Sequence, residues 1–197
     1  MKNPSINILT RTHNREKYFN VCKHSIVNQT YKNVNWIVGS DIDCPYYPNA
    51  IKLEERNNFS PIPAGHYYAP YNEYLNQLAT NVKDGWVMYL DDDDEFLSPN
   101  ALTDLANQID SEDIMLVWKV RITKNWIVPC KTFGQRIQSG DFSGIGFMFH
   151  SKYLPVDWGF ISCGDYRVAQ QLLNKGLKIK WVDEVLTSTQ EGPHNGK

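Results

Sequence analysis

The chain has 197 residues, of which 42% are hydrophobic and 21% charged, a composition typical of a folded domain that excludes a chain disordered throughout. Its 20 basic and 22 acidic residues give a net charge of −2, whereas nucleic-acid-binding domains are usually basic, so we expect no nucleic-acid partner. The apolar runs are about five residues long, against roughly 18 in a membrane helix, and the N-terminus does not resemble a secretory signal. These features predict a protein without a transmembrane segment. The four cysteines form no C-x-x-C pair, which favours reduced thiols in a cytoplasmic protein.

Short apolar runs alternate with helical spacings through the first part of the chain. Phe19, Cys22 and Ile26 recur every three or four residues after Asn14, which can cap a helix there. We expect strands at 5–10, 34–38, 50–53, 85–90 and 114–120, and helices after Asn14, from Pro70 and from Pro99. This alternation predicts an α/β fold whose mostly parallel central sheet is flanked by helices on both faces.

The rest of the chain continues this pattern. We expect strands at 126–128, 144–149 and 178–182, and a helix at 164–175 that Gly176 ends. We find no repeat, linker or low-complexity tract, so we predict one domain over residues 1–197. In parallel sheets ligands bind at the carboxyl ends of the strands. The segments that follow the predicted strands at this edge are 10–15, 39–43 and 91–95.

The third of these segments is a run of five acids, Asp91 to Glu95, directly after a predicted buried strand. Carboxylates this close repel one another, so something must offset their charge. In an extended chain Asp91 and Asp93 would point to one side, and Asp92 and Asp94 to the other. Two carboxylates on one side suit a hard cation such as Mg²⁺ or Mn²⁺. The alternative is an acidic first turn near the N-terminus of the following helix.

Several segments resemble glycosyltransferase family 2. Residues 6–15, INILTRTHNR, resemble the opening strand and turn of that family, and residues 25–31, SIVNQTY, resemble its S-I-L-x-Q-T-Y. Residues 85–97, GWVMYLDDDDEFL, resemble its G-E-Y-I-A-F-L-D-D-D-D-E-W-L closely. The resemblance covers about residues 5–105 and continues more weakly through 163–167, where the family often has an E-D pair.

The chain departs from the family pattern at four places. Arg11 stands where a Pro is usual, and Ser40 replaces the first acid of the pair after the second strand. Ser98 is an extra residue before Pro99. Gly164 replaces the first acid of the E-D pair, so that only Asp165 remains.

The resemblance implies the glycosyltransferase fold called GT-A and the transfer of a sugar from a nucleoside diphosphate to an acceptor hydroxyl, with inversion at the anomeric carbon. Residues 1–100 would form the half that binds the nucleotide sugar, and residues 101–197 the half that binds the acceptor. By family position Asp93 would be the direct ligand of Mn²⁺ or Mg²⁺. Asp91 and Asp92 would contact the donor ribose, or the metal through water. Asp94 would hold the sugar hydroxyls or stay solvated.

The resemblance also implies roles outside the acidic run. Asp41 matches the acid that recognises the nucleotide base, and we favour uracil; Thr10 and Arg11 lie at the same sheet edge and would contact diphosphate or base. Asp165 is the candidate general base, with helix capping as its ordinary role. His194 is a candidate metal ligand, because some enzymes of this fold close the metal site with a His near the C-terminus.

Several aromatic residues have two readings that the sequence leaves open. His66, Tyr67 and Tyr68 precede the helix at Pro70 and could line the donor site or pack that helix. Trp158 and Phe160 could stack on an acceptor sugar or lie in the core.

The sequence thus predicts a metal-dependent inverting glycosyltransferase that uses a UDP-sugar and a glycan, lipid-linked or protein acceptor. One alternative is a non-catalytic module that binds a nucleotide sugar or carbohydrate, which the missing acid at Gly164 favours. A second is a nucleotidyltransferase, but the glycine-rich phosphate loop and N-terminal Lys that this chemistry usually brings are not evident.

Overall fold

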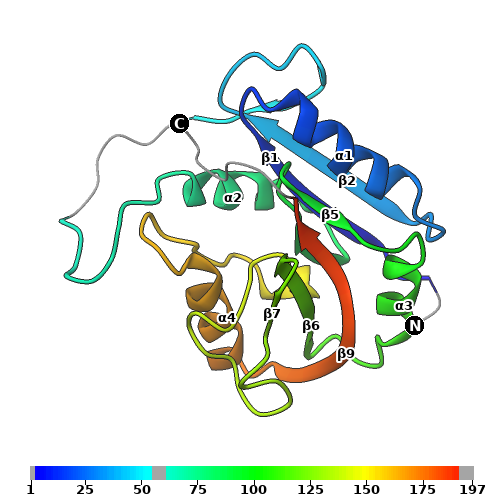
Figure 1. The fold of residues 1–197 in the computed structure, drawn as a ribbon, viewed down its shortest axis with the longest axis vertical. Helices are drawn as coiled ribbons and strands as arrows, with labels where there is room; N and C mark the ends of the chain where they lie inside the picture. The colour runs from blue at the N-terminus through cyan, green and yellow to red at the C-terminus, as the bar shows by residue number, and fades with distance from the viewer. Residues whose placement is uncertain (1–2, 55–60, 191–197) are drawn as a thin grey trace.

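The computed structural model describes residues 3–54 and 61–190, which form a central sheet with helices on both faces (Figure 1). The strands are β1 Ile6–Thr12, β2 Val34–Ser40, β3 Ile51–Lys52, β4 Trp86–Tyr89, β5 Asp94–Phe96, β6 Ile114–Thr123, β7 Trp126–Val128, β8 Phe147–His150 and β9 Lys178–Thr189. The helices are α1 Glu16–Val27, α2 Asn72–Ala79, α3 Ala101–Asn107 and α4 Gly164–Asn174, with a 3₁₀ turn at Ser151–Tyr153. None of these helices is long and apolar enough to cross a membrane.

The strands follow the order β3-β2-β1-β4-β8-β6-β9-β5, with β7 paired to β6. The first four are parallel, as expected for alternating strands and helices. β8 is antiparallel to both β4 and β6, whereas β9 runs parallel to β6. Near its end β9 still pairs with β6 along one edge, through Thr187 and Ser188, and pairs antiparallel with β5 along the other, so the sheet curls back toward the acidic run (Figure 1).

Apolar side chains fill both sides of the sheet. Along β1, Ile8 belongs to the cluster that includes Cys22 of α1, and its neighbour Leu9 to the cluster that includes Leu75 of α2. Val168 of α4 packs in this second cluster. Because adjacent strand residues point to opposite faces, one strand serves both clusters. The predicted two-sided covering of the sheet is therefore confirmed.

Several boundaries differ from the expected ones. Asn14 lies at φ 48° and does not cap α1, which follows Arg15 without a side-chain cap. The helix predicted from Pro70 begins at Asn72. β9 continues to Thr189 instead of ending at residue 182, and β5 was not expected. These two strands stabilise each other through a pairing distant in sequence, which local patterns do not reveal.

Candidate active site

The acidic run begins where β4 ends and forms a tight turn rather than an extended strand. The backbone N–H of Asp94 donates to the carbonyl of Asp91 at 3.0 Å. The turn brings carboxylate oxygens of Asp91, Asp93 and Asp94 within 4.8 Å of one another. The predicted alternation of sides is therefore wrong, because Asp94 joins Asp91 and Asp93, and Asp92 alone is outside the group.

Two arginines, Arg11 near the end of β1 and Arg15 just after this strand, offset part of this negative charge. Arg11 donates to Asp91 at 2.6 Å. Arg15 donates to Asp93 at 2.9 Å and also forms an ion pair with Asp92, which is fully buried. The sequence reasoning missed Arg15, although it lies in the segment expected at the same sheet edge as the acids.

Burial raises the pKa of the acids that these arginines do not fully compensate. The pKa of Asp94 is raised well above its usual value by burial and by the charges of Asp93 and Asp91. The pKa of Asp92 is raised to about 6 by burial, which Arg15 and a hydrogen bond from Thr12 oppose. These shifts mark a site with more negative charge than its surroundings balance.

The carboxylate group fits a hard divalent cation. Its three members offer only oxygen ligands, which Mg²⁺ and Mn²⁺ prefer. Oδ1 of Asp91 is buried and, within the described residues, has no hydrogen-bond partner, while Oδ2 is bound by Arg11. A buried carboxylate oxygen without a partner is costly, and a cation would supply the missing partner.

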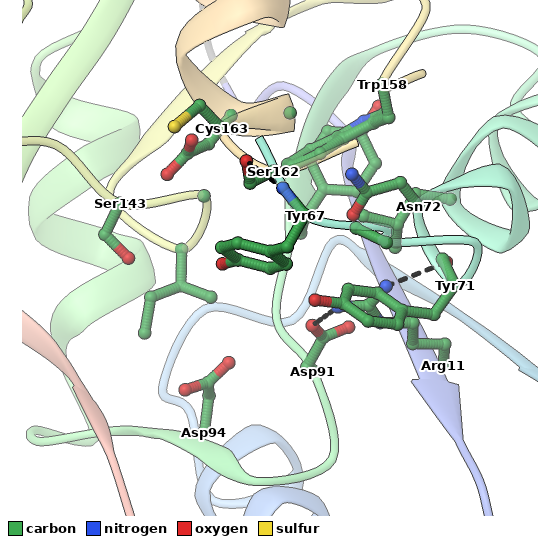
Figure 2. Close-up of a pocket in the computed structure, with 17 residues that line it drawn as sticks. Arg11, Tyr67, Tyr71, Asn72, Asp91, Asp94, Ser143, Trp158, Ser162 and Cys163 are labelled. Atoms are coloured by element: carbon green, nitrogen blue, oxygen red, sulfur yellow. Dashed lines mark hydrogen bonds and ion pairs between the residues drawn. The ribbon is translucent and has the colours of Figure 1, made fainter. Parts of the chain in front are cut away.

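A cavity of about 240 Å³ connects this group with the N-terminus of α4. Asp91, Asp94 and Arg11 line one side, and Ser162, Cys163, Gly164 and Asp165 line the other. Figure 2 shows Ser162 and Cys163 across the opening from Asp91 and Asp94. The chain therefore places Asp91, a predicted metal ligand, and Asp165, the predicted base, on one cavity, although they are about 70 residues apart in sequence; Asp93 does not line the cavity.

Asp165 lies in the first turn of α4, where the helix dipole favours a negative charge. The backbone N–H of Tyr166 donates to Oδ1 of Asp165 at 2.7 Å. The pKa of Asp165 is nevertheless raised, because burial outweighs the backbone hydrogen bonds. The cap position itself belongs to Cys163, at φ 62°, whose side chain makes no cap hydrogen bond, so Asp165 binds a backbone N–H of the first turn from inside the helix.

The other predicted donor contacts have different environments. Thr10 is fully buried, and its hydroxyl donates to Leu90 at 2.7 Å and accepts from Trp36 at 2.9 Å, so it supports the sheet edge from inside. Asp41 follows β2 and binds His13 at 2.7 Å and the Tyr74 hydroxyl at 3.0 Å.

A second cavity, of about 390 Å³, opens at the carboxyl ends of β2 and β3. Ser40 and Ile42, on either side of Asp41 in sequence, line it. Asp41, the predicted base-recognition residue, lines neither the first cavity nor the second, although its two sequence neighbours line the second.

Gln190, the residue directly after β9, binds the backbone of the acidic turn. The backbone N–H of Gln190 donates to Asp93 at 2.8 Å. Its side-chain amide donates to the carbonyls of Asp92 and Asp94 at 3.2 and 3.3 Å. Sequence reasoning missed this contact, because the role of Gln190 depends on the curl of β9. His194, predicted as a metal ligand with Asp91 and Asp93, lies outside the described residues.

No protein-family model and no curated protein matches the chain. Solved structures do resemble it. The glycosyltransferase TarS of S. aureus superposes with a TM-score of 0.73 at 16% identity, over 96% of this chain and 37% of TarS. The chain has the GT-A glycosyltransferase fold.

Two further structures with this fold were solved with ligands. A TarS fragment of residues 1–349 in complex with UDP-GlcNAc has a TM-score of 0.69 at 16% identity, over 97% of this chain and 60% of the fragment. The mannosyltransferase PcManGT of Pyrobaculum calidifontis, in complex with GDP-Man and Mn²⁺, has a TM-score of 0.62 at 15% identity, over 100% of this chain and 59% of its own. The chain thus spans between a third and two thirds of these neighbours.

Proposed function

We propose that this chain is a metal-dependent glycosyltransferase that moves a sugar from a nucleoside-diphosphate donor to an acceptor hydroxyl, with inversion. The observation that carries the proposal is the single cavity lined by Asp91 and Asp94 on one side and by Asp165 on the other. A sugar between them would have its leaving group on one face and the base on the opposite face. Attack from the base side then inverts the anomeric carbon.

Asp91, Asp93 and Asp94 would hold Mn²⁺ or Mg²⁺, with Asp93 as the direct ligand. The bound cation offsets the negative charge that develops on the leaving diphosphate. Arg11 lines the same side of the cavity and would contact the diphosphate. Asp92 is fully buried against Arg15 and Thr12, so we assign it to positioning the turn rather than to the donor.

Asp165 would take the proton from the acceptor hydroxyl as that oxygen attacks the sugar. A general base works best when its pKa lies near the pH of the reaction, and burial raises the pKa of Asp165 in that direction. Trp158 lies beside it, since the Trp158 ring closes the cavity next to Gly144 and Gly164. We assign Trp158 to shaping the cavity and excluding water.

We further propose UDP as the nucleotide, with the base near Asp41 and the second cavity. His13 binds one oxygen of the Asp41 carboxylate and Tyr74 the other, and each oxygen can accept a further hydrogen bond from the base. Gln190, four residues before His194, lies at the acidic turn, and four residues span at most about 14 Å. His194 is therefore kept as a proposed metal ligand, and His194→Ala should weaken Mn²⁺ binding in a titration.

A specific observation favours the alternative of a non-catalytic module. Gly164 replaces the first acid of the family's E-D pair, and packing requires Gly there. A Cβ at this position would lie 2.7 Å from Nδ2 of Asn72 and 2.8 Å from the carbonyl oxygen of Trp158. A module of this kind would bind the donor without consuming it, which separates it from the enzyme.

The test is UDP release from UDP-glucose, UDP-galactose and UDP-GlcNAc, with Mn²⁺ and after chelation of all divalent metal. We expect release from one donor, loss on chelation, and loss in Asp93→Asn and Asp165→Asn. Asp165→Asn should still bind UDP. Asp183→Asn is the matched control, because Asp183 is an exposed acid of β9 outside the cavity. Donor binding without release would favour the module, and full activity in Asp93→Asn would overturn the metal role.

A further inference from the structure

Three exposed tyrosines lie on the segment just before α2. Tyr67, Tyr71 and Tyr68 are 66%, 43% and 39% exposed. Tyr67 and Tyr71 line the active-site cavity, whereas Tyr68 does not. Single exposed aromatic residues are ordinary, but two at the mouth of one cavity indicate a binding surface.

The backbone that carries Tyr67 is fixed to the segment that leads into α4. The N–H of Ser162 donates to the carbonyl of Tyr67 at 3.0 Å, and the N–H of Ala69 donates to Phe160 at 2.8 Å. Tyr68 and Ile161 form a β-bridge between these two segments. Ser162 is three residues before Asp165, so Tyr67 is held in place relative to the proposed base.

Tyr67 and Tyr71 are held by different parts of the chain. The Tyr71 ring packs under the Arg11 guanidinium at 4.6 Å, and its carbonyl accepts from Arg11 at 2.8 Å. Tyr71 is thus tied to the side that faces the diphosphate. Figure 2 shows the Tyr67 ring extending into the opening between Ser162 and Asp91. The Tyr67 side chain is 66% exposed, so its hydroxyl is accessible to a ligand.

We propose that Tyr67 binds the acceptor and that the acceptor is a carbohydrate. This inference rests on the proposed function, because it places the acceptor on the side of Asp165. A pyranose has faces of C–H groups and a rim of hydroxyls, which match the ring face and hydroxyl of a tyrosine. The neighbouring walls offer Asn72, Ser143 and Ser162 as polar partners, rather than the continuous apolar groove that a lipid chain would need.

The experiment is saturation-transfer NMR of methyl glycosides of glucose, galactose, mannose and N-acetylglucosamine with the protein loaded with UDP and Mg²⁺. We expect at least one glycoside to receive saturation on its ring C–H protons. Tyr67→Ala should weaken its binding about tenfold, whereas Tyr67→Phe, which keeps the ring and loses only the hydroxyl, should weaken it about threefold. Tyr68→Ala is the matched control, because Tyr68 is adjacent, exposed and outside the cavity. It should bind like the wild type.

Calorimetry of UDP with Mg²⁺ distinguishes failure of the proposed function from failure of the acceptor proposal. If UDP does not bind, the proposed function fails and the acceptor proposal fails with it. If UDP binds but no methyl glycoside does, the carbohydrate acceptor is wrong while the nucleotide site stands. If a glycoside binds equally well to Tyr67→Ala, or if this variant weakens UDP binding instead, Tyr67 is not the acceptor residue.

Discussion

Arg15 neutralises a carboxylate that would otherwise be buried and unpaired. Asp92 is fully buried, and Arg15 contacts both Asp92 and Asp93. We expect Arg15→Ala to lower the free energy of unfolding by about 3 kcal/mol, because a buried charge loses its partner. Urea unfolding at pH 7 measures this. The double variant Arg15→Ala/Asp92→Asn should recover part of the loss, and Arg136→Ala, at an exposed arginine, should cost little. Equal stability of Arg15→Ala and wild type would refute the pairing.

The raised pKa of Asp165 gives a prediction for the pH dependence of transfer. A general base must be ionised, so kcat/KM should fall as the pH falls through the pKa of Asp165. Because burial raises this pKa above the usual 3.8, the acid limb should lie at a higher pH than an exposed aspartate would give. A pH profile of kcat/KM measures it. An acid limb at or below pH 3.8, with the protein folded, would remove Asp165 from that role.

At the scale of residues, local sequence was enough to predict where several acids lie, and their roles stay predictions. Asp91, Asp93 and Asp165 follow a strand or begin a helix, and all three lie in or beside one cavity. Sequence reasoning misjudged the residues whose role depends on the turn. Asp94 joins Asp91 and Asp93 because the chain turns between Asp91 and Asp94, and Thr10 is buried, with its hydroxyl bound to Leu90 and Trp36.

At the scale of elements, the parallel half was predictable and the curled half was not. β1, β2 and β4 are apolar runs with helices between them, so their order follows from local pattern. β5 is three residues within an acidic and aromatic segment, and it is a strand because β9 reaches it. The second half of β9 pairs with β6 as well as with β5, and both partners are distant in sequence.

The end of β9 leads to a prediction about metal affinity. Gln190 donates to carbonyls on both sides of Asp93, so Gln190→Ala should loosen the acidic turn and weaken Mn²⁺ binding at least tenfold. Calorimetric titration of Mn²⁺ measures it. Gln77→Ala is the matched control, because the Gln77 amide also binds backbone groups, at Glu54, but away from the turn. If both variants bind Mn²⁺ like the wild type, Gln190 has no positioning role.

At the scale of the whole molecule, the curl of the sheet creates the site. The acidic turn follows β4, the end of β9 pairs with β5 beside this turn, and Asp165 of α4 lines the same cavity. We propose that these three segments, which are far apart in sequence, form one nucleotide-sugar site. Within this site the acidic turn would bind a metal–nucleoside diphosphate.

The most direct test is calorimetric titration of UDP, GDP and dTDP into the wild type and Asp93→Asn, with and without Mn²⁺. We predict that UDP binds the wild type tightly with Mn²⁺ and at least tenfold more weakly without it. It should bind Asp93→Asn weakly under both conditions. Preference for GDP or dTDP would correct the nucleotide and keep the metal site. No binding of any nucleotide to the folded protein, or binding that ignores both Mn²⁺ and Asp93, would contradict the account.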